Sequence, residues 1–158
     1  HIEIYNLIFR HNLDLKKMNF FFSAGPGSYT GIRLGEGIAQ ILAWDEMKVF
    51  SFHHFDAPRI AGVEKGFWVT NAFKGQVFIY TWDKLGEAGE RNLVNASDFT
   101  MEIPEFGYTL SSENKDFSSL KTTKDLIQQF PEKIFPKVLS EKMREAPYYF
   151  RTLDEEFR

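Results

Sequence analysis

The chain has 158 residues, enough for one medium-sized domain or for two small lobes around a real core. Apolar residues make up 43% and aromatic residues 16% of the sequence, so the composition is that of a globular protein. Nineteen basic and 22 acidic side chains give a formal net charge of -3, which argues against a dedicated nucleic-acid-binding protein. The absence of cysteine excludes disulfides and thiolate zinc sites.

The first residues predict an amphipathic helix over 1–12, because Ile4 and Ile8 recur at helical spacing. The sequence begins with His1 rather than Met and enters this helical pattern at once. We therefore expect that it starts inside a longer parent chain. No apolar run approaches the ~20 residues that a membrane-spanning helix needs, and no signal-peptide pattern opens the sequence.

The next elements alternate between strand and helix. Residues 18–24 (MNFFFSA) form a short continuous apolar run that suits a buried parallel strand. The glycine-rich stretch GPGSYTG follows at 25–31, then a predicted helix over 32–44 and a strand over 47–52. The pattern breaks over residues 53–65, so we place a lobe boundary there, with one unit over 1–58 and a second over 59–158.

The second unit opens with a predicted hairpin, because two aromatic and β-branched runs (67–73 and 76–82) flank Lys74-Gly75. Neither face of the 76–82 strand is strongly polar, so we expect it to be central or covered on both sides. The remaining predicted elements are a strand near Leu93, a short helix from Ser97, a strand over 106–111, a capped helix over 122–130 and a last helix after Pro136.

The GPGSYTG stretch resembles a phosphate-binding loop but fails two named patterns. The dinucleotide motif needs a third glycine at its sixth position, where this loop has Thr30, and the P-loop needs a lysine that is absent here. Pro26 also removes one backbone donor. Two readings stay open from spacing alone: an anion site at a helix start, or a strand-to-helix corner in which Ser28 or Thr30 caps the helix.

Small residues recur every four positions along the predicted 32–44 helix, at Gly31, Gly35 and Ala39. Glycine inside a helix costs about 1 kcal/mol relative to alanine, so the stripe suggests that another backbone passes close by. That backbone could belong to this chain's own core or to a partner helix, and the sequence leaves both alternatives open.

Residues 25–35 (GPGSYTGIRLG) resemble the GPGSFTGLRIG signature of the TsaB (YeaZ) family. The hairpin at VTNAFKGQVFIY and the ending Pro147-Tyr148-Tyr149-Phe150-Arg151 are similar to the family pattern in order and spacing. The resemblance covers most of the chain, although only the eleven-residue signature is specific. It implies an α/β chain with the two-lobed actin-like ATPase (ribonuclease H-like) fold.

The family resemblance also implies a function. The chain would be a non-catalytic, cytoplasmic subunit that pairs with a catalytic paralogue, TsaD, in a complex that a small ATPase, TsaE, joins. That complex installs threonylcarbamoyl on adenosine next to the anticodon of tRNA, which this chain would contact only indirectly. The expected partner surface is a helix bundle flanked by Trp44, with the following interface residues: Ile4, Ile8, Gly31, Arg33, Gly35, Ile38, Ala39 and Leu42. The expected signature loop consists of Gly25, Pro26, Gly27, Ser28, Tyr29, Thr30 and Gly31.

The sequence departs from the family pattern in two places. The hairpin reads NAFKGQVF at 71–78 where the family has Asp-Ala-Arg-Arg-x-Glu-Val-Tyr, so a role for those charged side chains does not carry over. The family's first strand, hairpin and Asp-Thr turn have no counterpart before His1, so the first lobe lacks its N-terminal strands in this chain. Actin-like kinases bind phosphate with that turn, so we expect no cofactor, and a nucleotide only at an interface shared within the complex.

Two alternatives remain beside the scaffold hypothesis. One is a small-molecule kinase-like enzyme of the same fold, which would bind phosphate at the glycine loop, and the other is a homodimer whose helices pair with themselves. A metal site at His53, His54 and Asp56 is disfavoured, because adjacent strand residues point to opposite faces. We expect neither a metal nor catalytic residues in this chain.

Overall fold

Two β-sheets organise the chain in a computed structural model that describes residues 10–99, 107–110 and 117–150. The first sheet pairs β1 (Asn19–Ser23) with β2 (Lys48–Phe52) in parallel. The second has the order β5-β4-β3-β6-β7. Its strands are β3 (Gly66–Asn71), β4 (Gln76–Trp82), β5 (Glu90–Asn95), β6 (Gly107–Thr109) and β7 (Lys121–Thr122).

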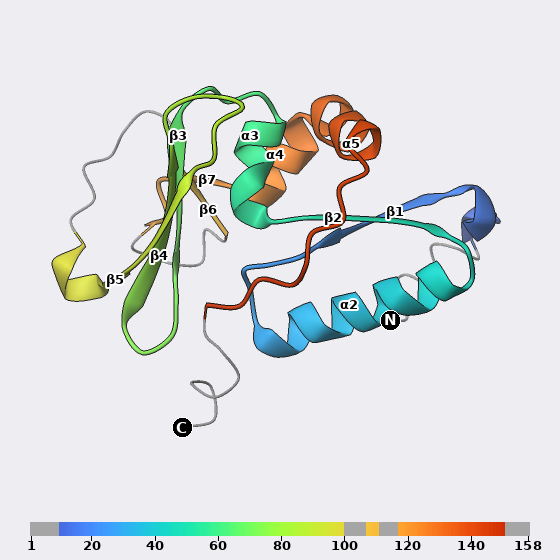
Figure 1. Ribbon diagram of the computed structural model, residues 1–158, viewed down its shortest axis with the longest axis horizontal. Coiled ribbons are helices and arrows are strands. Elements are labelled where there is room, and N and C mark those ends of the chain that lie inside the picture. The colour runs from blue at the N-terminus through green and yellow to red at the C-terminus, as the bar shows by residue number, and fades with distance from the viewer. Residues whose placement is uncertain (1–9, 100–106, 111–116, 151–158) are drawn as a thin grey trace.

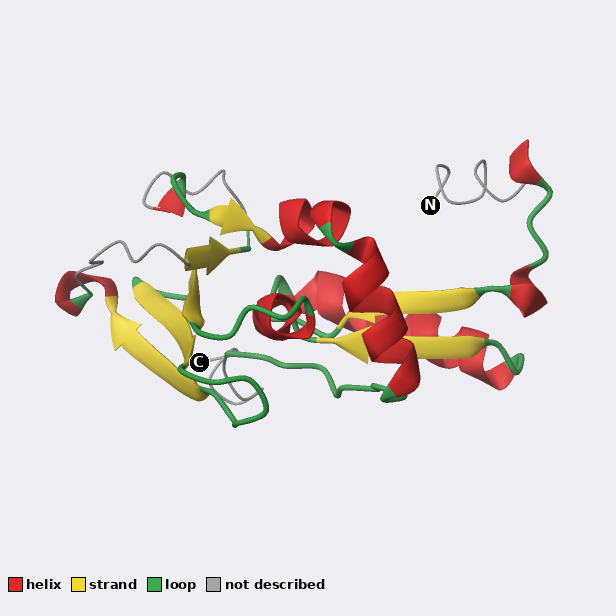
Figure 2. Ribbon diagram, turned by 90° about the horizontal axis from the view of Figure 1, so that it is seen from above, coloured by secondary structure: helices red, strands yellow, loops and turns green. Residues whose placement is uncertain are grey.

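Helices cover both faces of the first sheet. The long helix α2 (Tyr29–Trp44) packs beneath β1 and β2, and α5 (Pro131–Ser140) packs above them (Figures 1 and 2). Phe21 of β1 contacts Phe135 of α5 with ring centroids 4.6 Å apart. The short helices α3 (Ala57–Ile60) and α4 (Thr123–Gln129) pack against each other and α5 between the two sheets (Figure 1). None of the described helices is both long and apolar enough to cross a membrane.

The main core lies between the five-stranded sheet and helices α3, α4 and α5. Phe78, Tyr80 and Trp82 point into it from β4 and are each at most 3% exposed. On the opposite face of the same strand, Val77 packs into a second cluster that includes Phe117. The prediction that this strand is covered on both sides is therefore confirmed, and its aromatic residues serve the core.

Several sequence predictions are confirmed by these elements. The 18–24 run forms β1 and pairs in parallel, and the 67–82 segment forms the antiparallel β3–β4 hairpin, in which Lys74 and Gly75 adopt positive φ at the turn. The Thr-capped helix is α4, where Thr122 and Asp125 form a reciprocal capping box. The strand predicted near Leu93 corresponds to β5, and a 3-10 turn at Ala96–Asp98 lies where a short helix was predicted from Ser97.

Other predictions need correction. The helix predicted over 32–44 begins at Tyr29, because the Ser28 side chain caps it. The last helix begins at Pro131 rather than at Pro136 and ends at Ser140. Proline suits a first helical turn, and here the second proline is accommodated inside the helix at an exposed position.

The sequence pattern breaks over residues 53–65, but much of this segment is helical. A 3-10 turn over His54–Asp56 leads directly into α3, and Phe55 and Ala57 are completely buried. Another 3-10 turn, at Leu15–Lys17, precedes β1. The predicted helix over 1–12 lies mostly outside the described residues, as do Phe106 and Ser111 at the ends of the strand predicted over 106–111.

Candidate functional site

The signature loop GPGSYTG forms the corner between β1 and α2. Backbone hydrogen bonds hold it at its start, since Ala24 donates to the Phe52 carbonyl at 2.9 Å and the Gly25 carbonyl accepts from His54 at 2.8 Å. At its end, the Ser28 hydroxyl oxygen accepts the Gly31 N–H at 3.2 Å and caps α2. Such a cap stabilises a helix by about 1 kcal/mol. The geometry of this loop is therefore that of a strand-to-helix corner in which Ser28 caps the helix.

Gly25 is the position in this corner that only glycine can occupy. Its φ is +97°, and the peptide bond to Pro26 is cis. A Cβ atom at Gly25 would lie 2.6 Å from the Tyr148 carbonyl oxygen and 3.0 Å from Cδ1 of Ile32. The loop is thus closely covered by a segment more than a hundred residues further along the chain.

That covering segment runs over residues 143–150, and we call it the C-terminal strap. It leaves α5 and returns along β2, where the Ser51 N–H donates to the Met143 carbonyl and the Glu145 N–H donates to the Ser51 carbonyl (Figure 1). The Tyr148 N–H then donates to the Ala24 carbonyl at 2.7 Å. The boundary between units at 58/59 stays a prediction. The strap belongs to the predicted second unit, but it forms hydrogen bonds with Ala24 and Ser51 of the predicted first unit.

Arg144 of the strap also holds α2 in place. Its guanidinium donates to both carboxylate oxygens of Glu36 at 2.8 and 3.0 Å, and to the Ser51 hydroxyl at 3.0 Å. Ser51 is 1% exposed and donates in turn to the Glu145 carbonyl. The sequence offered no local signal for this network, because its members are 93 to 108 residues apart.

The α2 helix carries an apolar face toward solvent as well as one toward the sheet. Ile32 and Ala39 face the sheet and are buried, whereas Leu34, Ile41 and Trp44 are 51%, 62% and 80% exposed. These three exposed residues recur at spacings of seven and three, which places them on one side of the helix. We call them the outer stripe. Their spacing is visible in the sequence, but the partner surface was predicted from the recurring small residues Gly31, Gly35 and Ala39 instead.

The predicted interface residues are distributed around this helix. Gly31 and Arg33 are exposed, and Gly35, Ile38 and Leu42 are half-buried. Ala39 is fully covered by this chain, so its predicted contact with a partner is wrong: the small side chain lets α2 approach its own sheet. At Gly35, by contrast, an added Cβ would meet no atom within 4 Å. Ile4 and Ile8 lie outside the described residues.

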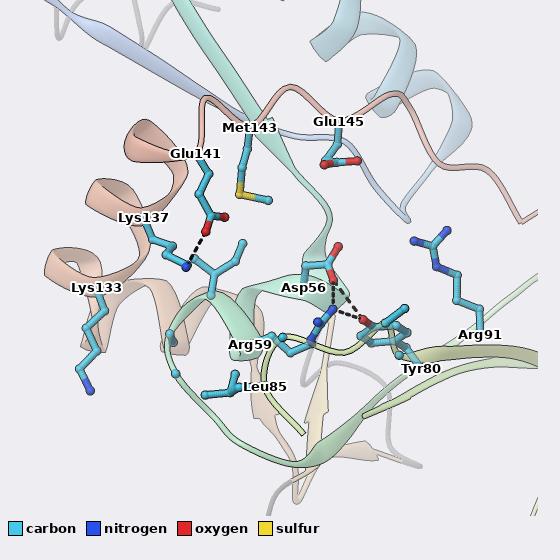
Figure 3. Close-up of a pocket in the computed structure, with 16 residues that line it drawn as sticks. Asp56, Arg59, Tyr80, Leu85, Arg91, Lys133, Lys137, Glu141, Met143 and Glu145 are labelled. Atoms are coloured by element: carbon cyan, nitrogen blue, oxygen red, sulfur yellow. Dashed lines mark hydrogen bonds and ion pairs between the residues drawn. The ribbon is translucent and has the colours of Figure 1, made fainter. Parts of the chain in front are cut away.

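Two cavities flank these features. A cavity of about 330 Å³ separates the signature loop from the β3–β4 turn. It is lined by Gly27, Ser28, Tyr29, Asn71, Ala72, Phe73, Leu110, Tyr149 and Phe150. A larger cleft of about 820 Å³ opens between α3, α5, the strap and the turn that follows β4 (Figure 3). Neither was visible in the sequence, because each is assembled from distant segments.

A hydrogen-bonded network forms one wall of the larger cleft. Asp56 accepts from Arg59 at 3.3 Å and from the Tyr80 hydroxyl at 3.2 Å, and Arg59 also donates to Tyr80 (Figure 3). Arg59 donates as well to the Glu87 carbonyl. Burial, and then the nearby Asp56 carboxylate, raises the pKa of Tyr80 above its ordinary value. The phenol therefore stays protonated at neutral pH and donates its proton to Asp56.

His53 and His54 serve different purposes behind this wall. His53 faces the Asp56 carboxylate at 3.4 Å and the Ala146 carbonyl at 3.0 Å, so it links the strap to α3. Nδ1 of His54 is buried and has no hydrogen-bond partner among the described residues. Within the same residues, no group of three or more His, Cys, Asp or Glu side chains is placed to hold a metal ion.

The histidines give a pH dependence that can be measured. Burial, and secondly the neighbouring His53, lowers the pKa of His54 from 6.5 to about 4. The unfolded chain therefore takes up this proton near pH 6.5 and the folded chain only near pH 4. We expect stability to be fully present above pH 6.5 and to fall by about 3 kcal/mol between pH 6.5 and 4 through this residue.

Urea unfolding at pH 7 and pH 4 measures this loss for wild type and for His54→Leu. The variant should lose about 3 kcal/mol less stability than wild type, whereas the exposed control His11→Leu should behave like wild type. Equal losses in wild type and His54→Leu would show that other groups carry the titration.

Comparison with known proteins found similar solved structures, but no match among protein-family models or curated proteins. The structure of YeaZ from Pseudomonas aeruginosa matches with a TM-score of 0.54 and 16% identity, over 82% of this chain and 73% of that one. A second structure is described as an uncharacterized protein with similarity to peptidase YeaZ from Pseudomonas aeruginosa. It matches with a TM-score of 0.58 and 17% identity, over 94% of this chain and 81% of that one. The chain therefore has the actin-like ATPase fold of the YeaZ proteins, the family whose signature residues 25–35 resemble.

Proposed function

We propose that this protein is a TsaB-like scaffold subunit of the bacterial complex that makes threonylcarbamoyladenosine in tRNA. In this proposal the chain is cytoplasmic, carries no catalytic residue and contacts tRNA only indirectly. It pairs with a TsaD-like catalytic subunit, and a TsaE-like ATPase joins the assembly. The observation that carries the proposal is the outer stripe of α2, the helix that starts within the signature loop.

The exposure of the outer stripe is unusual for a helix that already packs on a sheet. A surface helix normally buries one apolar side and presents polar residues on the other. Here Ile41 and Trp44 are more than 60% exposed although the opposite side of α2 is buried. Contiguous exposed apolar residues of this kind mark protein–protein contacts. A partner helix that packs on this side would find open space at Gly37, where an added Cβ meets no atom within 4 Å.

The contacts of the signature loop support a positioning role. Ser28 uses its hydroxyl oxygen to cap α2, and Gly25 is closed over by the strap. Both interactions fix the direction in which α2 leaves the corner. In this proposal the chain holds no cofactor of its own, and a nucleotide binds only at an interface that the chain shares with other subunits.

The experiment measures binding to the TsaD-like subunit of the same organism by calorimetry. We expect Ile41→Glu to weaken binding by at least about 100-fold, because the interface would bury an unpaired charge. The control Leu93→Glu changes a residue that is also exposed, at 41%, but lies on β5, and it should bind within threefold of wild type. Circular dichroism checks that both variants fold.

The outcomes separate the proposal from its alternatives. If wild type fails to bind the TsaD-like subunit, the scaffold function is wrong. If wild type binds and a folded Ile41→Glu variant binds equally well, the interface assignment is wrong. Self-association in light scattering that the TsaD-like subunit cannot displace would favour a permanent homodimer instead.

A further inference from the structure

The larger cleft contains cationic groups whose hydrogen-bonding capacity is not used by the protein. Arg91 extends into it from β5, opposite Lys133 and Lys137 of α5 and Glu141 just after that helix (Figure 3). The Arg91 guanidinium lies over the Phe55 ring at 4.8 Å and the Tyr148 ring at 5.2 Å. Among the described residues it forms no side-chain hydrogen bond and no ion pair. An arginine is thus held in position by two aromatic rings with its N–H donors free.

The acidic side chains of the cleft, in contrast, are largely engaged. Asp56 accepts hydrogen bonds from Arg59 and Tyr80, and Glu141 pairs with Lys137. Glu145 lies 4.0 Å from Nδ1 of His53. None of these three carboxylates forms an ion pair with Arg91.

The second guanidinium of the cleft, that of Arg59, is used by the protein. Its two terminal nitrogens are hydrogen-bonded, and its Nε is buried beyond the reach of a ligand in the cleft. Lys133 lies over the Phe130 ring at 5.0 Å and forms no ion pair with a described residue. Arg91 and Lys133 therefore present cationic N–H donors that no carboxylate of the described residues pairs with, and such donors are what an anion requires.

We propose that this cleft binds a small molecule that carries a carboxylate or phosphate group, with Arg91 as its principal contact. The planar fork of arginine matches either anion through two parallel hydrogen bonds. The cleft volume of about 820 Å³ lies within the roughly 300–1,000 Å³ range of small-molecule sites. The site does not depend on the proposed scaffold function, since the isolated chain contains all of its residues.

The test is an NMR titration of the isolated ¹⁵N-labelled chain with sodium phosphate and, separately, with sodium succinate at constant ionic strength. We expect saturable shifts of the Arg91 Nε–Hε signal and of the backbone amides that line the cleft. The affinity measured from these amides should be at least about tenfold lower in Arg91→Gln. The control is Arg10→Gln, since Arg10 is also exposed and does not line the cleft. This variant should bind both probes as wild type does.

The result identifies the ligand class or overturns the site. Tighter binding of phosphate supports a phosphate ester as the ligand, and tighter binding of succinate supports a carboxylate. The proposal is overturned if neither probe gives a saturable shift, if sodium chloride gives the same shifts, or if Arg91→Gln binds as tightly as wild type.

Discussion

Substituting Gly25→Ala is expected to lower the free energy of unfolding by about 3–5 kcal/mol. Two effects add. The φ of +97° is unfavourable for any residue with a side chain, and the new Cβ would lie 2.6 Å from the Tyr148 carbonyl oxygen. Because that oxygen belongs to the backbone, the strap would have to move away. The hydrogen bond from the Tyr148 N–H to the Ala24 carbonyl would then weaken or break.

The matched control is Gly62→Ala, because Gly62 has a similar φ of +92° but open space around its Cβ position. This substitution should lower the free energy of unfolding by only about 1 kcal/mol, because the unfavourable φ is its only cost. Urea unfolding of the two variants beside wild type measures the difference. If both variants lose the same stability, the strap does not press on the signature corner.

Replacing Phe55→Ala is expected to cost about 3–5 kcal/mol, in the range found for large aromatic residues removed from cores. The Phe55 side chain is 0% exposed and lies at the centre of an aromatic cluster. Its ring centroid lies 4.8 Å from those of His53 and Tyr80 and 5.4 Å from that of Tyr148. The cavity left behind would border β4, α3 and the strap together.

Thermal and urea unfolding measure this loss, with Phe73→Ala as control. Phe73 is 46% exposed at the β3–β4 turn, so its truncation should cost less than about 1 kcal/mol. A loss at Phe55 as small as that at Phe73 would mean that the segment before α3 is not part of the core.

The elements that the sequence predicts well are those with local causes. The Phe-rich run of β1, the β3–β4 hairpin and the capping box of Thr122 each depend on residues that are neighbours in the chain. The signature corner belongs to the same class, because Ser28 caps its own helix within three residues. Periodicity and turn chemistry describe such features directly.

The elements that sequence reasoning misses depend on distant contacts. The 53–65 segment shows no clear periodicity, yet Phe55 is drawn into a helical turn by aromatic partners from β4 and the strap. Ala39 looked suited to a partner helix and instead lies against the chain's own sheet. The cleft around Arg91 joins four segments, so no local pattern could reveal it.

The strap also has a consequence for how the chain acquires its structure during synthesis. Ser51 and Arg144 are 93 residues apart, so the edge of β2 leaves the ribosome long before the segment that covers it. Contacts of such long sequence separation form slowly, because a large loop must close first. Until then the β2 edge and the signature corner stay uncovered, and the nascent chain carries an open strand edge that other chains can pair with.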